Sequence, residues 1–335
     1  VRAVRKLDFG WKARFVCSDW KDPRRSCQIR RKTVRPKIFR STYTLPMATP
    51  SENLLSYALV TPSFRLDVDR CALLVESVER WAAPYLRHYL VIDRRDVPMF
   101  KHFESDRTQI LIVEDIVPRW LVRIPGVRRF WFSFRTRPVK NWILQQIVKL
   151  SIPDVVGDDV LIYTDSDVFY VAPYDPRAYE RDGKVPLFVE TGQRGLIENN
   201  DHWHSVAARL LGLTPEADYD TNYIGNAICW RRDNVLKMNR LLESVANKSW
   251  ERAVAPLSGF SEYILYGMYA NRVLGEASGH WNDDKIRTLN HWTPAPLDMA
   301  GLQELKSRLS PEYHSVMVSA KSRTPVADIR KVFLQ

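Results

Sequence analysis

Two aspartates one residue apart, Asp165 and Asp167, lie between two apolar runs in the segment DVLIYTDSDVFYV, residues 159–171. The apolar runs predict a buried strand, and alternate residues of an extended strand share a face, so both carboxylates would lie on one side. Like charges this close destabilise each other unless a cation or a proton lies between them. A hard divalent cation such as Mg²⁺ or Mn²⁺, carrying waters and a diphosphate, would remove that cost. The alternative is a solvated turn in which one aspartate caps a helix.

The elements around this pair alternate between short apolar strands and amphipathic helices, which is typical of an α/β domain with a mostly parallel sheet. We expect strands at 57–64, 88–93, 108–115, 159–171, 186–190 and 223–232, and helices at 67–81, 138–150, 202–211, 233–246 and 260–273. The segment from residue 297 onward predicts a mainly helical extension. The chain has no internal repeat and no Pro- or Gly-rich linker, so we expect one domain followed by this extension.

Five segments in chain order resemble one family of enzymes. They are ALVTPSF, HYLVIDRRD, LIYTDSDVFYV, NYIGNAICWRRDNV and SEYILYG, within residues 57–292. The DSD triplet looks like the DXD motif of GT-A-fold nucleotide-sugar glycosyltransferases, and the set is similar to a bacterial glycosyltransferase-like group of unknown function. The resemblance implies a Rossmann-like GT-A domain over 52–296, with a mixed, mostly parallel sheet flanked by helices. The extension would then cover 297–335.

The same resemblance implies a metal-dependent transfer of a sugar from a nucleoside diphosphate sugar to a glycan or lipid-linked acceptor, in surface polysaccharide synthesis. UDP-sugars are the favoured donors, and Mn²⁺ or Mg²⁺ is the implied cofactor. The metal would be held by Asp165, Asp167 and a third ligand, for which His291 is the first choice and His280 the reserve. The donor would contact Thr61, Pro62 and Ser63 in the loop after the first strand, Asp93 at the end of the second strand, and Ser166.

Further residues have candidate roles in the chemistry. Three cations, Arg137, Lys140 and Lys149, precede the DSD segment and could offset charge on the leaving diphosphate. Glu262 is a candidate general base at a helix start, although Ser-Glu-Tyr departs from the Glu-Asp pairing usual in the family. Equally, it could be a first-turn glutamate stabilised by the helix dipole. Acceptor hydroxyls could contact Asn222, Tyr223 and Asn226, or these residues could only shape a turn.

The net charge of +11 belongs to the first 46 residues, which hold 14 Lys and Arg against 3 Asp and Glu; the remainder balances 36 against 36. We therefore expect no nucleic-acid partner for the body of the chain. The basic stretch 119–140 is the exception: it could be an exposed face, or lie on an anionic membrane. The leader 1–46 is interpreted as lying upstream of the true start or as a disordered arm, with a basic nucleic-acid arm as the alternative.

The compartment follows from what the sequence lacks. No stretch approaches the length of about 18 apolar residues that a membrane span needs, and no apolar segment follows the first charges as in a signal peptide. Four cysteines without CxxC spacing favour a reducing environment, with Cys71 and Cys229 as buried apolar residues. We expect a cytoplasmic protein that contacts the inner face of the membrane peripherally.

Other functions fit parts of the same pattern. A haloacid-dehalogenase-type phosphatase would use Asp165 as a nucleophile, with WNDDK at 281–285 as its second acidic pair, although Phe169 stands where that motif expects Thr or Val. The protein could also be a basic binding protein without catalysis, or a transferase that binds sugars without turnover. In either case Asp165 and Asp167 would have no catalytic role.

Overall fold

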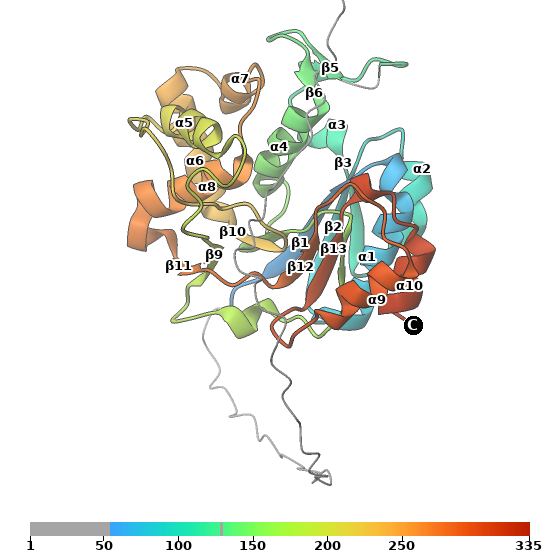
Figure 1. Cartoon of the computed structure of the whole chain (residues 1–335). Coiled ribbons are helices and arrows are strands. Elements are labelled where there is room, and N and C mark those ends of the chain that lie inside the picture. The colour runs from blue at the N-terminus through green and yellow to red at the C-terminus, as the bar shows by residue number, and fades with distance from the viewer. Residues whose placement is uncertain (1–53, 128–129) are drawn as a thin grey trace, which may run out of the picture. The chain divides into compact units, whose positions relative to one another are not determined.

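The computed structural model describes residues 54–127 and 130–335. The leader 1–46 lies outside these residues. The chain from Leu55 to Gln335 forms one compact unit, which includes the extension 297–335. Figure 1 shows its central sheet with helices around it. No helix in 54–127 or 130–335 has the length and apolar character needed to cross a membrane.

The central sheet has five strands in the order β10 (Ile228–Arg231), β7 (Val160–Tyr163), β1 (Tyr57–Ser63), β2 (Arg87–Ile92) and β3 (Thr108–Ile112). β1 pairs in parallel with β7 on one side and β2 on the other, and β2 pairs in parallel with β3. Only the edge strand β10 runs antiparallel, beside β7. The sheet is therefore mixed and mostly parallel, with β7 delivering the DSD segment to its carboxyl edge, as predicted.

Both faces of the central sheet are buried, which explains why its strands read as continuous apolar runs. Alternate residues of β1 and β7 belong to two different cores. Ala58, Val60, Leu161 and Tyr163 pack with α4 (Asn141–Ser151) and α8 (Glu262–Met268), whereas Tyr57, Leu59, Val160 and Ile162 pack with α1 (Val68–Trp81). The period of two along each strand thus fixes which helices cover which face.

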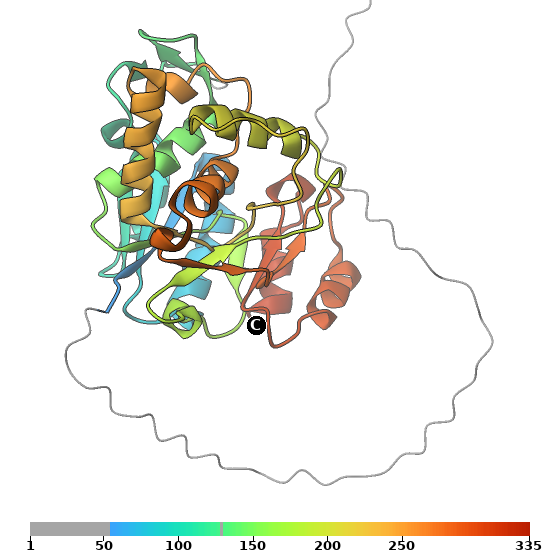
Figure 2. The same cartoon turned by 90° about the vertical axis from the view of Figure 1, so that its left-hand side faces the viewer.

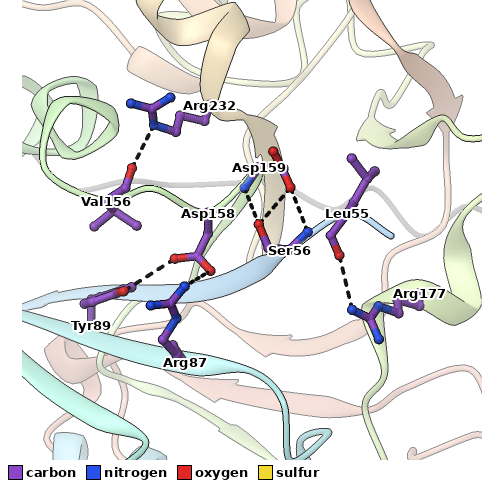
Figure 3. Close-up of polar contacts among 9 residues, drawn as sticks. All are labelled: Leu55, Ser56, Arg87, Tyr89, Val156, Asp158, Asp159, Arg177 and Arg232. Carbon is purple, nitrogen blue, oxygen red and sulfur yellow. Dashed lines mark hydrogen bonds and ion pairs between the residues drawn. The ribbon is translucent and has the colours of Figure 1, made fainter. Parts of the chain in front are cut away.

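Polar contacts at the amino edge of the sheet hold β7 in register (Figure 3). The carboxylate of Asp159 accepts hydrogen bonds from the Ser56 backbone N–H at 2.9 Å and from its hydroxyl at 2.7 Å, and the Asp159 N–H donates to the Ser56 hydroxyl at 2.9 Å. The neighbouring carboxylate of Asp158 pairs with Arg87 at 2.9 Å and accepts from the Tyr89 hydroxyl at 3.4 Å. Because a slip of one residue would exchange the faces of β7, these contacts also fix where the DSD segment leaves the sheet.

Three smaller sheets surround the central one. β8 (Val168–Tyr170), β13 (Ser315–Val318) and β12 (Thr288–His291) form the first, in which β13 lies between the other two. β9 (Val185–Phe188) pairs with β11 (His280–Asp283) in the second. The third is an antiparallel sheet of β4 (Leu121–Val122), β5 (Phe130–Ser133) and β6 (Val139–Lys140), which Figure 1 shows next to the start of α4.

The remaining regular elements are short or amphipathic helices. They are α2 (Val97–Phe100), α3 (Val113–Ile116), α5 (Asn200–Leu210), α6 (Arg232–Ala246), α7 (Trp250–Val254), α9 (Met299–Ser307), α10 (Val326–Phe333), six 3₁₀ turns described in 54–127 and 130–335 (Arg65–Asp67, Lys101–Phe103, Ile152–Asp154, Pro176–Tyr179, Gly275–Ser278 and Ala320–Ser322) and a π-helix, Tyr269–Leu274.

The C-terminal extension contains a strand in addition to the helices α9 and α10. Its residues 315–318 form β13, which pairs with both β12 and β8. Side chains of α9 and α10 share a core with Leu73 of α1 and Phe169 of β8. Figure 2 shows this segment, in red, packed against one side of the unit. The extension therefore supports the strand that follows the DSD segment.

Several predicted boundaries also shift. The strand expected at 108–115 ends at Ile112, because the short helix α3 begins at Val113 and has Glu114 and Asp115 in its first turn, where acidic residues are favourable. The helix expected from 138 begins at Asn141, because Val139 and Lys140 pair with β5. The strand expected at 223–232 is confined to β10, and the helix expected at 260–273 divides into α8 and the π-helix.

Candidate functional site

The DSD segment forms a tight turn directly after β7. The Val168 N–H donates to the Asp165 carbonyl at 3.1 Å, which closes the turn, and the chain then enters β8 in a different sheet. The prediction of one continuous strand with both carboxylates on the same face is therefore wrong. Hydrogen bonding to β1 ends at Thr164, whose N–H donates to the Val60 carbonyl at 3.1 Å. Beyond Thr164 the two aspartates have separate partners.

Asp165 contacts a buried ammonium group. Its Oδ1 lies 3.4 Å from Nζ of Lys149, which extends from α4 and also lies 3.0 Å from Oε1 of Glu262. Lys149 further donates to the Tyr263 hydroxyl at 2.9 Å. Burial alone would lower the pKa of Lys149, but Asp165, Tyr263 and Glu262 together raise it well above its usual value. The ammonium therefore remains charged and links α4, α8 and the DSD turn.

Asp167 has a different partner from Asp165. Its Oδ2 accepts the Ala320 N–H at 2.9 Å, in the turn that follows β13. Burial and the charge of Asp165 raise the pKa of Asp167 to about 6. The Ala320 N–H and the guanidinium of Arg70 act in the opposite direction. Asp67 adds a third carboxylate nearby, and burial raises the pKa of Asp67 as well. The turn thus brings carboxyl groups together in a partly desolvated environment.

Arg70 is a residue near the site that sequence reasoning missed. It lies in the buried stripe of α1 beside Cys71, and donates to the carbonyls of Val318 at 2.8 Å and Thr324 at 3.2 Å. The positive charge of Arg70 lowers the pKa of Asp67 and the pKa of Asp167. A charged residue within the apolar spacing of a predicted helix was the available signal, since buried arginines need partners.

Ser166, predicted to contact the donor, lies at the centre of the turn. It is buried, and its hydroxyl donates to Oδ2 of Asp67 at 3.4 Å. This bond ties the turn to the start of α1, and it lowers the pKa of Asp67 against the larger effect of burial. The hydroxyl therefore has a structural partner in addition to its predicted one.

The turn meets only part of the requirement for a metal site. Among residues 54–127 and 130–335, no group of three His, Cys, Asp or Glu side chains is arranged to hold a metal ion. Mg²⁺ and related ions are commonly held by one or two carboxylates, with waters and substrate phosphates completing the shell. The oxygen chemistry and mutual repulsion of Asp165 and Asp167 fit a site of that kind, in which the substrate supplies the remaining ligands.

The two histidines considered as third ligands differ in their surroundings. His291 ends β12, and its backbone carbonyl accepts the N–H of Ser319, next to Ala320. Its Nε2 lies 2.9 Å from the Thr293 hydroxyl. His280 is buried, with Nε2 2.7 Å from the Tyr266 hydroxyl and Nδ1 3.2 Å from a backbone carbonyl. Both ring nitrogens of His280 thus have partners within the fold, and the choice of a third ligand stays a prediction.

The predicted donor loop is part of β1. Thr61 is fully buried, and its hydroxyl lies 3.0 Å from Nε2 of His88 on the neighbouring strand. Thr61, Pro62 and Ser63 all pair with β2, whereas β7 has already ended beside Val60. The expectation of a loop is therefore wrong, since the edge of β1 projects three residues past β7. Only its final residue, Ser63, is partly exposed.

Asp93 follows β2 at the carboxyl edge of the central sheet, as predicted. Its carboxylate lies 3.3 Å from Arg95 and 3.4 Å from Arg123. Burial raises the pKa of Asp93, and the charge of Arg123 opposes that rise. The carboxylate is thus already paired with two guanidinium groups, and a donor ribose or base would share it with them.

The three predicted cations separate into two groups. Lys149 contacts Asp165, whereas Arg137 and Lys140 are exposed in and beside β6 and form no ion pair with a described residue. The structure therefore brings only Lys149 to the DSD turn. Arg137 and Lys140 precede α4 in the chain, and their contact with a donor stays a prediction.

The residues predicted for the acceptor site are tied into the loop before β10. Asn222 donates to Glu190 at 3.1 Å, and its side-chain carbonyl accepts the Ile224 N–H at 2.9 Å. Tyr223 is buried, whereas Asn226 is partly exposed and donates to the side chain of Asn290 at 2.9 Å. Asn226 thus reaches the strand that ends in His291, and it is the member of the set best situated to meet a ligand.

The phosphatase alternative gains no support from the second acidic pair. Asp283 is buried at the end of β11, where its carboxylate pairs with Arg287 and accepts the Lys285 N–H at 3.1 Å. The carboxylate is engaged in stabilising this loop. Since no three-ligand metal cluster occurs in the described ranges, Asp283 does not complete a site with Asp165.

Comparison with known proteins identifies the family of the chain. The chain belongs to DUF6492, described as a family of unknown function, which matches residues 54–293. No curated protein sequence matches it. Among solved structures, it is similar to mouse xyloside xylosyltransferase 1 in its apo form, with 8% sequence identity and a TM-score of 0.42 over 80% of this chain and 99% of that chain. At these values the likeness carries no argument about activity.

Proposed function

We propose that the protein is a metal-dependent glycosyltransferase that transfers a sugar from a nucleoside diphosphate sugar to a glycan or lipid-linked acceptor. UDP-sugars are the favoured donors, and the activity belongs to surface polysaccharide synthesis in the cytoplasm. The observation that carries the proposal is the DSD turn at the carboxyl edge of a mostly parallel sheet, where burial and the charge of Asp165 raise the pKa of Asp167. Open α/β sheets bind ligands at this edge.

The surrounding side chains support diphosphate chemistry. When bound, Mn²⁺ or Mg²⁺ would supply positive charge that stabilises the leaving diphosphate. Asp165 and Asp167 are the residues that would hold the ion. Asp167 is oriented by the Ala320 N–H, and Lys149 holds Asp165 from inside the protein at 3.4 Å. These contacts restrict the conformation of the turn before any ligand arrives. The turn would therefore lose little conformational freedom on binding.

Glu262 remains our proposed general base, but its contacts restrict that role. The side chain is buried and pairs with Lys149 at 3.0 Å, and the Glu262 N–H donates to Gln146 at 3.1 Å. A base must reach the proton that it removes. An acceptor hydroxyl would therefore have to approach Glu262 past Lys149, or Glu262 would serve only as the partner of the ammonium.

Donor binding tests the proposal. The thermal stability of the full chain is measured with a set of nucleoside diphosphate sugars, with and without Mn²⁺. At a ligand concentration 100 times Kd, binding stabilises the folded protein by about 2.7 kcal/mol. We expect stabilisation only when nucleotide sugar and Mn²⁺ are both present, followed by release of the nucleoside diphosphate on incubation with acceptor.

Isosteric variants make the test specific. Asp165→Asn and Asp167→Asn keep side-chain shape but remove charge, and should each weaken metal-dependent donor binding at least tenfold. Glu104→Gln is the matched control, since this exposed glutamate precedes β3 at the opposite edge of the sheet. If no nucleotide stabilises the protein under either metal condition, the proposal fails. Stabilisation without product would instead indicate a sugar-binding protein that has no turnover.

A further inference from the structure

The small sheet of β4, β5 and β6 has two chemically different faces. Residues directly opposite each other on paired strands share a face, and here Val122 lies opposite Phe132, and Phe130 opposite Lys140. All four of these side chains are exposed. The alternate residues point the other way and are buried: they are Leu121, Trp131, Ser133 and Val139. The sheet therefore buries one face and presents aromatic rings on the other.

The aromatic surface continues past the end of β5. Phe134, two residues beyond Phe132, is 70% exposed, and its ring centroid lies 5.1 Å from that of Phe132 in an edge-on arrangement. Ile124, after β4, is also exposed. Single exposed apolar residues are ordinary, but a cluster of rings on one face usually marks an interaction site. We call Val122, Ile124, Phe130, Phe132 and Phe134 the aromatic face.

The chain segment that carries the aromatic face has charged residues of a single sign. Between Asp115 and Asp154 the chain has eight Arg or Lys residues and no Asp or Glu. Two of the eight are engaged elsewhere, because Arg123 pairs with Asp93 and Lys149 is buried. Four others, Arg119, Arg135, Arg137 and Lys140, are exposed, and none forms an ion pair with a described residue.

We infer that the aromatic face and its exposed cations dock the protein on an anionic lipid surface. Phenyl rings enter the boundary between headgroups and acyl chains, and Arg and Lys beside them bind acidic headgroups. Exposed cations in the same segment as apolar rings complement such a surface, whereas a second copy of this chain would bring the same cations together. This inference does not rest on the transferase proposal, although docking would bring the start of α4 towards a lipid-linked acceptor.

Vesicle binding by the full chain tests the inference. Co-sedimentation is measured with vesicles of phosphatidylcholine alone and of phosphatidylcholine mixed with phosphatidylglycerol, at low and high salt. We expect binding to the mixed vesicles that falls with added salt, because salt screens exposed charges. The basic leader 1–46 is present in every variant, so differences between variants report on the aromatic face alone.

Two variants and two controls separate the contributions. Phe132→Ser with Phe134→Ser removes two rings, and Arg135→Gln with Arg137→Gln and Lys140→Gln removes three charges; each should lower the partition coefficient at least tenfold. The controls are Leu66→Ser, an exposed apolar residue outside the face, and a triple Gln variant of exposed lysines at Lys101, Lys237 and Lys248, and both should bind as the parent does. Thermal unfolding verifies that all variants are folded.

Three outcomes would overturn the inference. Equal binding by the parent and the two face variants would mean that the leader or another surface carries the affinity. An equal loss of vesicle binding in the lysine control would indicate that binding depends on positive charge in general and not on a specific site. A parent that self-associates without vesicles, with the association abolished by the two serines, would assign the aromatic face to a second copy of the chain.

Discussion

Lys149 and Glu262 form an ion pair that is almost completely excluded from solvent. Nζ lies 3.0 Å from Oε1, and the two side chains are 3% and 7% exposed. The same ammonium lies 3.4 Å from Asp165, which is 38% exposed. One buried cation therefore joins a carboxylate of the core to a carboxylate at the candidate site, and a change in the pair should affect both stability and the DSD turn.

Removing the ammonium should destabilise the protein strongly. In Lys149→Met, the carboxylate of Glu262 would remain buried without its partner, and breaking a buried pair in this way costs about 3–5 kcal/mol. Urea unfolding followed by circular dichroism measures the loss. The double variant Lys149→Met with Glu262→Gln should lose less than Lys149→Met alone, because neither charge remains. A double variant that is less stable by the sum of the two single losses would show that the pair is not coupled.

Glu262→Gln separates catalysis from structure. If Glu262 is the general base, the variant should transfer the sugar of bound donor about 10²–10⁴ times more slowly than the parent does. Ser261→Ala is the control, since the Ser261 hydroxyl caps the same helix by accepting the Ile264 N–H at 3.4 Å, and losing a cap costs about 1 kcal/mol. Equal slowing in both variants, measured as single-turnover rates, would give Glu262 a structural role only.

His280 should make stability depend on pH. Its Nδ1 faces the carbonyl of Val185, which can only accept, so Nδ1 carries the proton and Nε2 accepts from the Tyr266 hydroxyl. Burial lowers the pKa of His280 from 6.5 to about 4. Between these values the unfolded chain binds a proton that the folded chain does not, so the stabilising contribution is complete above pH 6.5 and is lost as the pH falls towards 4.

The measurement is the free energy of unfolding between pH 7.5 and 4.5 for the parent and for His280→Gln. The variant should be less stable at neutral pH but should lose less on acidification. Buried His88 and His314, whose pKa values burial lowers to about 3, will keep part of the slope. His102→Gln, at an exposed position, should leave the slope as it is. Parallel profiles for His280→Gln and the parent would contradict the assignment of a neutral imidazole.

Much of the central sheet could be predicted because its strands are buried on both faces. β1 and β7 are continuous apolar runs in the sequence, and their order along the chain is enough to suggest a parallel sheet. The position of Asp93 and the DSD segment at the carboxyl edge followed from that pattern alone. By contrast, β13 is a four-residue strand with three apolar residues, too short to distinguish from helix by periodicity, and its pairing with β8 depends on the tertiary fold.

The details of the site depend on contacts that local sequence does not encode. Asp167 meets the N–H of Ala320, which lies 153 residues further along the chain. Because this bond and the start of β8 close the segment into a turn, the extended geometry expected for DSD does not form. Lys149 was among the predicted residues, but its partners Glu262 and Tyr263 become neighbours only when α4 packs against α8.

Gly267 of α8 should not tolerate a side chain. A Cβ at this position would lie 2.2 Å from two ring atoms of Tyr223, a distance that real contacts do not reach. Tyr223 is buried, with the Asn271 amide 3.4 Å from its hydroxyl, so Gly267→Ala should cost about 1–3 kcal/mol through overpacking. Gly267→Ala combined with Tyr223→Leu should recover part of the loss, since a smaller side chain leaves room for the methyl group.

In the proposed transferase, Gly267→Ala should also raise KM for the acceptor and leave donor binding as it is, because the ring must move within the loop of Asn222 and Asn226. An unchanged acceptor KM in a folded Gly267→Ala protein would remove Tyr223 from the acceptor site.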